Sequence, residues 1–321
     1  MKVRRFIIFA VLFFIAAAFA FGDTASPAGT TVYTFFYNVV YEPFPFPLIG
    51  FINNARGDHS LFQIGFVNLN TGNFTGLQYG FVNRTGENFL GLQYGFVNTT
   101  GGNFSGLQYG FVNTAANNVI GAQIGFVNVA RQAVTGTQIG FINVADSYEN
   151  GIPIGFLSFV RNGGYRAIEY SFTEFHPLTV GFKIGLEIFY STIFAAYNPV
   201  NEFEHGGFAT GLGFGSIIPI GNFFFFNPEL NFLSSVSRNR ASISYISFVP
   251  YFGINLGRFS IAAAPSVTWV HTIDVERLNR RFDVNIRSAE IPDPLFSLYT
   301  HNQNDYNRMV VGARVAARLR L

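Results

Sequence analysis

The chain offers few side chains that could do chemistry, and the densest group of them lies near its C-terminal end. The stretch HTIDVE places a histidine, an aspartate and a glutamate within His271–Glu276. Such a trio could support acid–base catalysis or hydrolysis, but no identifiable serine nucleophile accompanies it. The five histidines lack metal-ligand spacing, and the chain has no cysteine. We therefore predict that the protein is not an enzyme and has no cofactor or metal.

A different set of polar residues recurs with strict spacing in the first half of the chain. The stretch GLQYGFVN begins at Gly76, Gly91 and Gly106, and the glycine before the phenylalanine recurs every fifteen residues from Gly50 to Gly155. Glutamine and asparagine cannot act as acids or bases near neutral pH, so their expected role is hydrogen bonding. A repeat without insertions predicts one structural unit for each copy.

Residues within one copy alternate in character. In Phe89–Val97 the glycines and Gln93 share one face, whereas leucines, Tyr94 and Phe96 share the other. A period of two predicts a strand, and the segments between copies are rich in turn residues. The charged residues between Leu61 and Ser158 all lie in these turns: Arg84, Glu87, Arg131, Asp146 and Glu149.

Two architectures can use this unit. In the first, each copy is one strand of an antiparallel transmembrane β-barrel, with the large apolar face toward lipid and the Gly/Gln face toward the lumen. In the second, each copy is one coil of a parallel β-solenoid, in which Gln, Asn and Phe stack in ladders. The strict period favours the solenoid, whereas the thin interior of a fifteen-residue coil favours the barrel.

The N-terminal segment predicts export. Lys2, Arg4 and Arg5 precede an apolar run, and Ala18-Phe-Ala20 has the small-x-small pattern of a cleavage site. We expect a cleaved signal peptide over residues 1–20. A membrane-anchoring helix is the alternative, but the run is short for a span of about 20 apolar residues. Without the signal the chain is nearly neutral, so its total charge gives no reason to expect nucleic acid as a partner.

The composition favours a membrane protein built from strands. The chain is 49% hydrophobic and only 12% charged, with 41 Phe and 15 Tyr. After the signal, no apolar run is long enough for a spanning helix, a combination typical of transmembrane β-barrels. We divide the chain into an N-terminal segment at 21–46, fifteen-residue β repeats at 47–160 and C-terminal β-barrel strands at 161–321.

The second half loses the period but keeps the alternation. Leu178–Ser191, Phe208–Ile220 and Phe259–Val270 each separate an apolar face from a smaller or more polar one, and Trp269 lies on an apolar face near a strand end. Residues 201–207 and the charged stretch 272–307 predict loops. The C-terminal residues 308–321 form an amphipathic strand of the kind that outer-membrane assembly machinery is expected to read, although Leu321 replaces the usual final Phe.

These patterns resemble a known family. The repeats GLQYGFVN, the exit GIPIGFLSFVRNGGYRAIEY and the following LTVGFKIGLEIFYSTIFAAYN are similar to bacterial outer-membrane surface-repeat proteins. In that family G-x-Q-x-G-x-x-N repeats lead into a G-x-P-x-G-x-x-S exit and a β-rich C-terminal part. The resemblance covers roughly residues 47–198 and implies a bacterial surface location. It transfers no catalytic residue.

We therefore expect an all-β, transmembrane antiparallel β-barrel of about 16 strands that includes the repeats, or alternatively an 8-stranded C-terminal barrel preceded by a repeat β-solenoid or sheet. The function expected is an outer-membrane surface protein, either a passive channel for small solutes or a structural or adhesive protein without an open pore. Its expected partners are outer-membrane lipid, the assembly machinery, and small solutes or an extracellular ligand. The residues predicted to face the lumen are Gln78, Gln93, Gln108, Gln123, Gln138, Glu169, Lys183, Glu187, Glu229, Arg314, Arg318 and Arg320.

Overall fold

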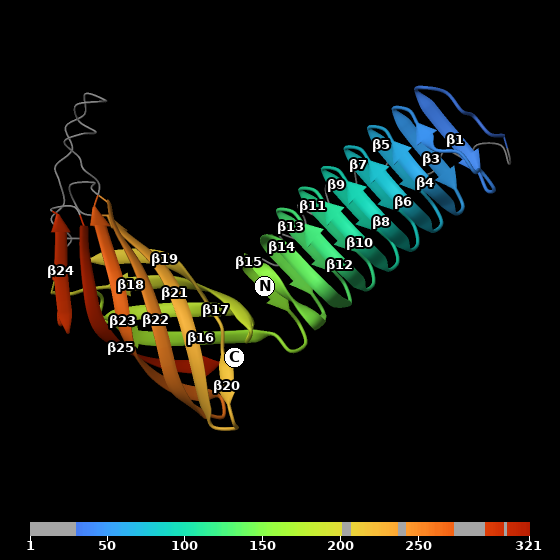
Figure 1. Cartoon of the computed structure of the whole chain (residues 1–321). Helices are drawn as coiled ribbons and strands as arrows, with labels where there is room; N and C mark the ends of the chain where they lie inside the picture. Colours follow the sequence, from blue (N-terminus) through green and yellow to red (C-terminus); the bar gives the residue numbers. More distant parts are fainter. Residues whose placement is uncertain (1–29, 201–206, 237–241, 273–292, 305–306) are drawn as a thin grey trace, which may run out of the picture. The chain divides into compact units, whose positions relative to one another are not determined.

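The computed structural model describes residues 30–200, 207–236, 242–272, 293–304 and 307–321. The predicted signal peptide, the loop at 201–206 and most of the charged stretch 272–307 lie outside them. Within the described residues the chain is all-β, and it divides into two compact units, Met1–Gly140 and Phe141–Leu321. Figure 1 shows the strands of both units. The described residues form no helix long and apolar enough to cross a membrane.

The first unit is a parallel β-solenoid in which each repeat contributes two strands. The copy that begins at Phe89 forms β8 (Phe89–Tyr94) and β9 (Val97–Thr100), and the next forms β10 (Phe104–Tyr109) and β11 (Val112–Ala115). β8 pairs with β10 and β9 with β11, both in parallel, so every residue lies beside its copy fifteen residues later. The other strands are β1 (Tyr37–Tyr41), β2 (Leu48–Ile49), β3 (Ile52–Arg56), β4 (His59–Ile64), β5 (Val67–Asn70), β6 (Phe74–Tyr79), β7 (Val82–Thr85), β12 (Val119–Ile124), β13 (Val127–Ala130) and β14 (Ala133–Ala145).

The prediction of a single barrel of about 16 strands is therefore wrong, and the alternative of a separate repeat solenoid describes the fold. The expected nine-residue strand is interrupted at Gly95-Phe96, where the chain turns from β8 to β9. Only glycine fits at this corner, because a Cβ on Gly95 would lie 2.2 Å from the Gly80 carbonyl oxygen of the previous coil. Alternation alone could not reveal the corner, since it continues through it.

A second glycine of each copy permits the close stacking of coils. Gly91 has a φ of +133°, and a Cβ there would lie 2.0 Å from the Gly76 carbonyl oxygen. Both the backbone conformation and the approach of the neighbouring coil exclude a side chain. The copy that begins at His59 instead has Leu61 at this position, with a φ of 79°. The motif G-x-Q-x-G thus records two places where one coil touches the next.

The second unit begins at Phe141 within β14, includes β15 (Ser147–Val160), the last repeat coil, and continues into a closed antiparallel barrel. Eight strands form the closed ring, in the order β16-β17-β18-β19-β21-β22-β23-β25, and β25 pairs back with β16. β20 (Ile218–Ile220) and β24 (Tyr299–Asn304) pair with β21 and β25. The ring strands are β16 (Tyr165–Phe172), β17 (Leu178–Leu186), β18 (Phe189–Tyr197), β19 (Phe208–Gly215), β21 (Phe224–Val236), β22 (Ser242–Leu256), β23 (Phe259–Thr272) and β25 (Asn307–Arg320).

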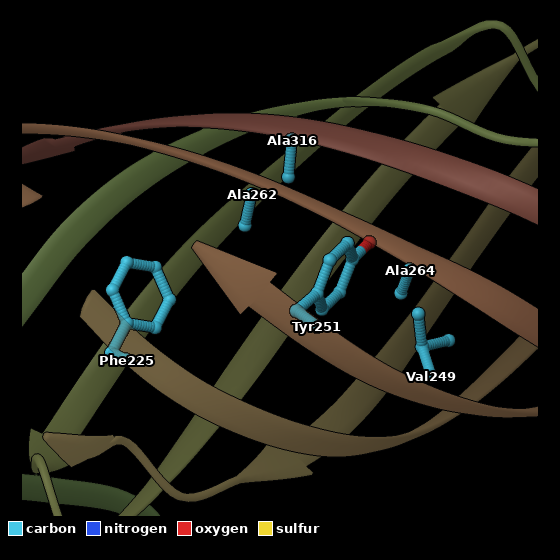
Figure 2. Packing of buried hydrophobic residues seen from close by; sticks show 6 residues of the cluster. All are labelled: Phe225, Val249, Tyr251, Ala262, Ala264 and Ala316. Carbon is cyan, nitrogen blue, oxygen red and sulfur yellow. The ribbon is translucent and has the colours of Figure 1, made fainter. Parts of the chain in front are cut away.

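Inside and outside alternate along these strands. In β23 buried and non-buried residues follow one another along nearly the whole strand, as a barrel wall requires. Part of the interior is apolar: Phe225 and Tyr251 fill space left by Ala262, Ala264 and Ala316, with Val249 beside them (Figure 2). Small residues on β23 and β25 thus accommodate the large rings of β21 and β22.

We expect Gly91→Ala to destabilise the solenoid. The added methyl group would meet the Gly76 carbonyl oxygen, and the strained backbone alone costs about 1–3 kcal/mol. Urea unfolding followed by circular dichroism measures the free energy of unfolding. The control is Leu90→Ala, a truncation of the adjacent, half-exposed side chain, which should change it far less. Equal effects of the two substitutions would contradict the stacking argument.

Candidate functional sites

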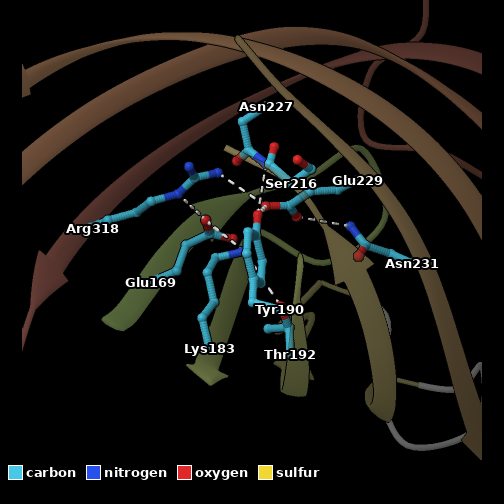
Figure 3. A network of polar contacts seen from close by, with 9 residues as sticks. All are labelled: Glu169, Lys183, Tyr190, Thr192, Ser216, Asn227, Glu229, Asn231 and Arg318. Atoms are coloured by element: carbon cyan, nitrogen blue, oxygen red, sulfur yellow. Dashed lines mark hydrogen bonds and ion pairs between the residues drawn. The ribbon is translucent and has the colours of Figure 1, made fainter. Parts of the chain in front are cut away.

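Four charged residues meet in the interior of the barrel. Lys183 of β17 lies 2.6 Å from the Glu229 carboxylate of β21 and 3.1 Å from the Glu169 carboxylate of β16. Arg318 of β25 binds both carboxylates as well, at 3.1 Å from Glu229. All four side chains are almost fully buried, and Figure 3 shows them converging from four strands. The two cations and the two anions of this inner charge cluster balance.

Neutral polar groups complete the inner charge cluster. The Tyr190 hydroxyl donates to Glu229 at 2.6 Å, and the Asn227 amide donates to the Tyr190 oxygen at 2.7 Å and to the Ser216 carbonyl. The Asn231 amide donates to the second Glu229 oxygen at 3.4 Å. A buried carboxylate is stable only when hydrogen bonds and opposite charges replace its water. This network therefore supplies both buried carboxylates with hydrogen-bond and ion-pair partners as part of the packing.

A second ion pair fills another part of the barrel interior. Arg314 donates to both oxygens of Glu174 at 2.9 Å, and also to the hydroxyls of Ser247 and Thr268. Burial alone would raise the pKa of Glu174, but the charge of Arg314 and the hydrogen bonds from Arg314 and Thr268 bring that pKa below its usual value. Glu174 follows β16, outside the strands. The pair contributes one positive and one negative charge, so the barrel interior as described stays neutral.

The two charge networks leave little free space between them. The cavity that Glu169, Tyr245 and Arg314 help to line has a volume of about 20 Å³, enough for about one water molecule. Ion pairs of mixed sign thus occupy the interior rather than line a wide channel. The geometry is that of a small barrel whose side chains fill it.

The predicted lumen-facing residues of the second half fall into two groups. All five of the first group lie in the barrel interior: Glu169, Lys183, Glu229 and Arg318 contact one another, and Arg314 pairs with Glu174. Glu187 and Arg320 instead form an ion pair at the barrel mouth, where each side chain is about half exposed.

The five glutamines predicted to face the lumen lie in the solenoid interior instead. Gln78, Gln93, Gln108, Gln123 and Gln138 are all fully buried, and each donates its side-chain amide to the Gln fifteen residues earlier at 2.6–2.7 Å. They are absent from the barrel lumen because the repeats form coils rather than barrel strands. This Gln ladder begins at Gln63.

The repeat asparagines form a second ladder of opposite polarity. Asn83 donates to the Asn98 oxygen fifteen residues later at 2.9 Å, whereas Gln93 donates to Gln78 fifteen residues earlier. The second amide hydrogen of Asn83 donates to the Tyr94 carbonyl, which fixes the direction of the ladder. Two rows of aligned amide dipoles therefore run in opposite directions through the same interior.

The repeat also exposes rows of aromatic side chains. Tyr79, Tyr94 and Tyr109 are each about half exposed and stack at 5.2 Å, beside a parallel row of stacked phenylalanines. Between the two rows runs a groove floored by the corner glycines. Most of the lining coils contribute a glycine, a phenylalanine and either a tyrosine or an isoleucine; none of the described lining residues is charged.

Of the candidate stretch His271–Glu276, the structure describes only the first two residues. The His271 ring contacts the Asn307 side-chain oxygen at 2.9 Å in an exposed position, and Asp274 and Glu276 lie outside the described residues. Among the residues that the structure describes, no group of three or more His, Cys, Asp or Glu could hold a metal ion.

The residues predicted to face the lumen omit Tyr190 and Glu174 as well as the neutral polar members of the barrel networks. Alternation through Leu178–Ser191 as one strand places Tyr190 on the apolar face, but the chain reverses between β17 and β18 and turns Tyr190 inward. Gly185, with a φ of 148°, pairs with Tyr190 and was the available signal for an irregularity. Glu174 was missed because its segment read as a connection, and alternation says nothing about a side chain beyond a strand end.

Comparisons with protein-family models, with curated proteins and with solved structures return no match for this chain. The sites must therefore be interpreted from their own chemistry.

We expect Gln93→Leu to lower the free energy of unfolding of the solenoid by about 2–4 kcal/mol, because it removes a ladder bond on each side and each orphaned buried group costs ~1–3 kcal/mol. Gln63→Leu is the matched control. Gln63 ends the ladder beside Leu48, so this change removes one ladder bond instead of two, together with its bond to the Leu69 carbonyl. The loss should be smaller than for Gln93→Leu, and chemical denaturation measures both. Equal losses would show that the ladder contributes nothing beyond packing.

We expect Glu229→Gln to destabilise the barrel by about 3–5 kcal/mol, because it leaves Lys183 and Arg318 with one buried carboxylate between them. The half-exposed Glu187→Gln should cost ~1 kcal/mol or less. Urea unfolding in detergent micelles measures both. A loss for Glu229→Gln no larger than for Glu187→Gln would refute a structural role for the inner charge cluster.

Proposed function

We propose that the protein is a bacterial outer-membrane surface protein in which the eight-stranded barrel is the membrane anchor and the fifteen-residue repeats form the exported binding or structural module. Export through the predicted signal peptide at residues 1–20 is part of this proposal. The observation that supports it is the distribution of side chains in the barrel, which is the reverse of that in a soluble protein: apolar side chains cover the outside and charged ones fill the inside.

The outer surface of the barrel supports a lipid environment. Ile261, Val267 and Trp269 point outward from β23 and are each 43–50% exposed, and Phe248 and Leu230 are similarly exposed on neighbouring strands. Inward positions hold the charges instead. A contiguous apolar surface of this kind is rare on monomeric soluble proteins and is typical of a membrane face.

Strand length is compatible with a membrane span. β23 has 14 residues. At a rise of ~3.3 Å per residue and a tilt near 40°, it would cover about 35 Å along the barrel axis. The apolar band of an outer-membrane barrel is about 25 Å tall. The longer strands would therefore cross the band and extend beyond it.

The filled interior favours a structural or adhesive protein over a passive channel. Six charged side chains, paired within two networks, occupy the described barrel lumen. Opening a pore would require these pairs to separate in a confined space, which is costly. The exposed aromatic rows of the repeats are then the surface best suited to an extracellular ligand. Lipid and the assembly machinery, which would read β25, are the other proposed partners, and nucleic acid is not among them.

The single tryptophan allows a direct test of membrane anchoring. With the protein reconstituted in vesicles of brominated phospholipid, the fluorescence of Trp269 should be quenched strongly, because its side chain lies on the outer face of β23. The control carries Trp269→Phe and Ile261→Trp, which moves the reporter along the same face. Its quenching should peak with bromine at a different acyl depth. Absence of quenching in both proteins would refute the anchor.

Conductance separates the two functional classes. In planar bilayers we expect no stable openings from the native protein, because the inner charge cluster closes the lumen. The variant Lys183→Ala/Glu229→Ala removes two bulky paired side chains while conserving net charge, and it serves as the comparison. Stable, voltage-independent openings of the native protein would instead support the passive channel.

A further inference from the structure

The barrel mouth at the tight-turn end contains a second cluster of charge, which shares Arg318 with the inner charge cluster. It is formed where β25 ends and where the turn from β22 to β23 brings Arg258 beside it, since the Arg320 backbone amide donates to the Arg258 carbonyl at 2.8 Å. A pocket of about 310 Å³ opens here. The charged residues in its lining are Glu187, Arg258, Arg318 and Arg320.

We propose that this mouth pocket binds a phosphate-bearing molecule. Three guanidinium groups line it, and although Glu169 and Glu229 balance Arg318 and Glu187 balances Arg320, the charge of Arg258 leaves the lining net positive, which favours an anion. Planar guanidinium groups match the oxygens of phosphate and bind them by paired hydrogen bonds.

The arginines of the pocket have N–H donors that their carboxylate partners do not use. Glu169 and Glu229 accept from Nε and Nη2 of Arg318, but Nη1 of this buried side chain has no hydrogen-bond partner within the described part of the chain. Figure 3 shows that nitrogen turned away from both carboxylates. A buried donor without a partner is unfavourable unless a ligand or water satisfies it. Arg320 commits one nitrogen to Glu187, and the exposed Arg258 extends the donor set to the rim.

The remaining walls indicate the rest of the ligand. The pocket is larger than a bare anion needs, and Tyr165, Ile217, Pro219 and Phe225 contribute apolar lining. The Arg318 guanidinium lies 5.5 Å from the centre of the Phe225 ring, a cation–π distance, and both residues line the pocket. The pocket therefore suits an organic phosphate, with the phosphate on the arginines and carbon groups on the apolar wall. A phospholipid headgroup and a soluble phosphate ester share this chemistry.

The test is isothermal titration of the full chain in uncharged maltoside micelles, with two probes. Glycerol phosphate represents a soluble ester, and dihexanoyl phosphatidic acid represents a lipid headgroup. We expect at least one to bind, and each of Arg258→Gln and Arg320→Gln to weaken it about tenfold by removing charge-assisted bonds. Glu187→Gln should strengthen binding, because it frees Arg320 and removes the one acidic group among the described residues of the lining. Tighter binding of the lipid probe than of the ester assigns the source as a lipid, and the reverse assigns a soluble ligand.

Arg131→Gln is the matched control. Arg131 is an exposed arginine of the repeats, so this change removes the same charge and should leave the affinity unchanged. Binding that is equally strong in the Arg258 and Arg320 variants would overturn the proposal, as would the failure of both probes to bind the native chain. Because Arg258 and Arg320 are exposed, folding of their variants can be verified by circular dichroism. The outcome does not depend on membrane anchoring, which the fluorescence of Trp269 tests separately.

Discussion

A buried amide side chain needs one partner that donates a hydrogen bond and one that accepts. In this protein the equivalent amide side chains of the neighbouring repeats are those partners. Gln93 accepts from Gln108 and donates to Gln78, so the same residue type serves as both partners. This works only when successive copies lie in parallel and in register, fifteen residues apart. The rest of the solenoid follows from that requirement: glycine where coils touch, aromatic rings stacked in rows outside, and charges in the turns. A shift of register by one residue would bury the aromatic face and expose the amides.

The amide ladders end where other residue types replace Gln and Asn, and these residues differ between the two ends of the solenoid. At the first coil the Gln position is taken by Leu48, fully buried in an apolar cluster with Val40 and Ala55. In the last coil Pro153 and Ser158 stand where earlier copies have Gln and Asn. Asn143 donates to the Ile154 carbonyl at 3.1 Å and reaches Ser158 only at 3.5 Å. An amide ladder that continued to the edge would leave groups ready to pair with another chain, and these substitutions remove them.

The barrel meets the same constraint with charges instead of amides. Its outside is apolar, so polar groups can be accommodated only inside, where each ion needs a partner. Lys183 and Arg318 both pair with Glu169 and Glu229, and Arg314 forms a bidentate ion pair with Glu174. These residues come from strands far apart in the sequence. Closure of the ring through β16 and β25 brings the first and last of them together.

Several features of the protein could be read directly from the sequence. Strict spacing showed that each repeat is one unit, and alternation identified strands and the inward side of Lys183, Glu229 and Arg318, because both patterns depend only on local geometry. Local sequence patterns could not decide between one large barrel and a solenoid. The choice depended on whether Gly95 continued a strand or turned a corner, and either conformation is open to a glycine. Likewise, which acid meets which base, and whether Tyr190 points in or out, depended on the strand pairing. Hydrogen bonds between distant strands settle those questions, and they exist only once the chain has folded.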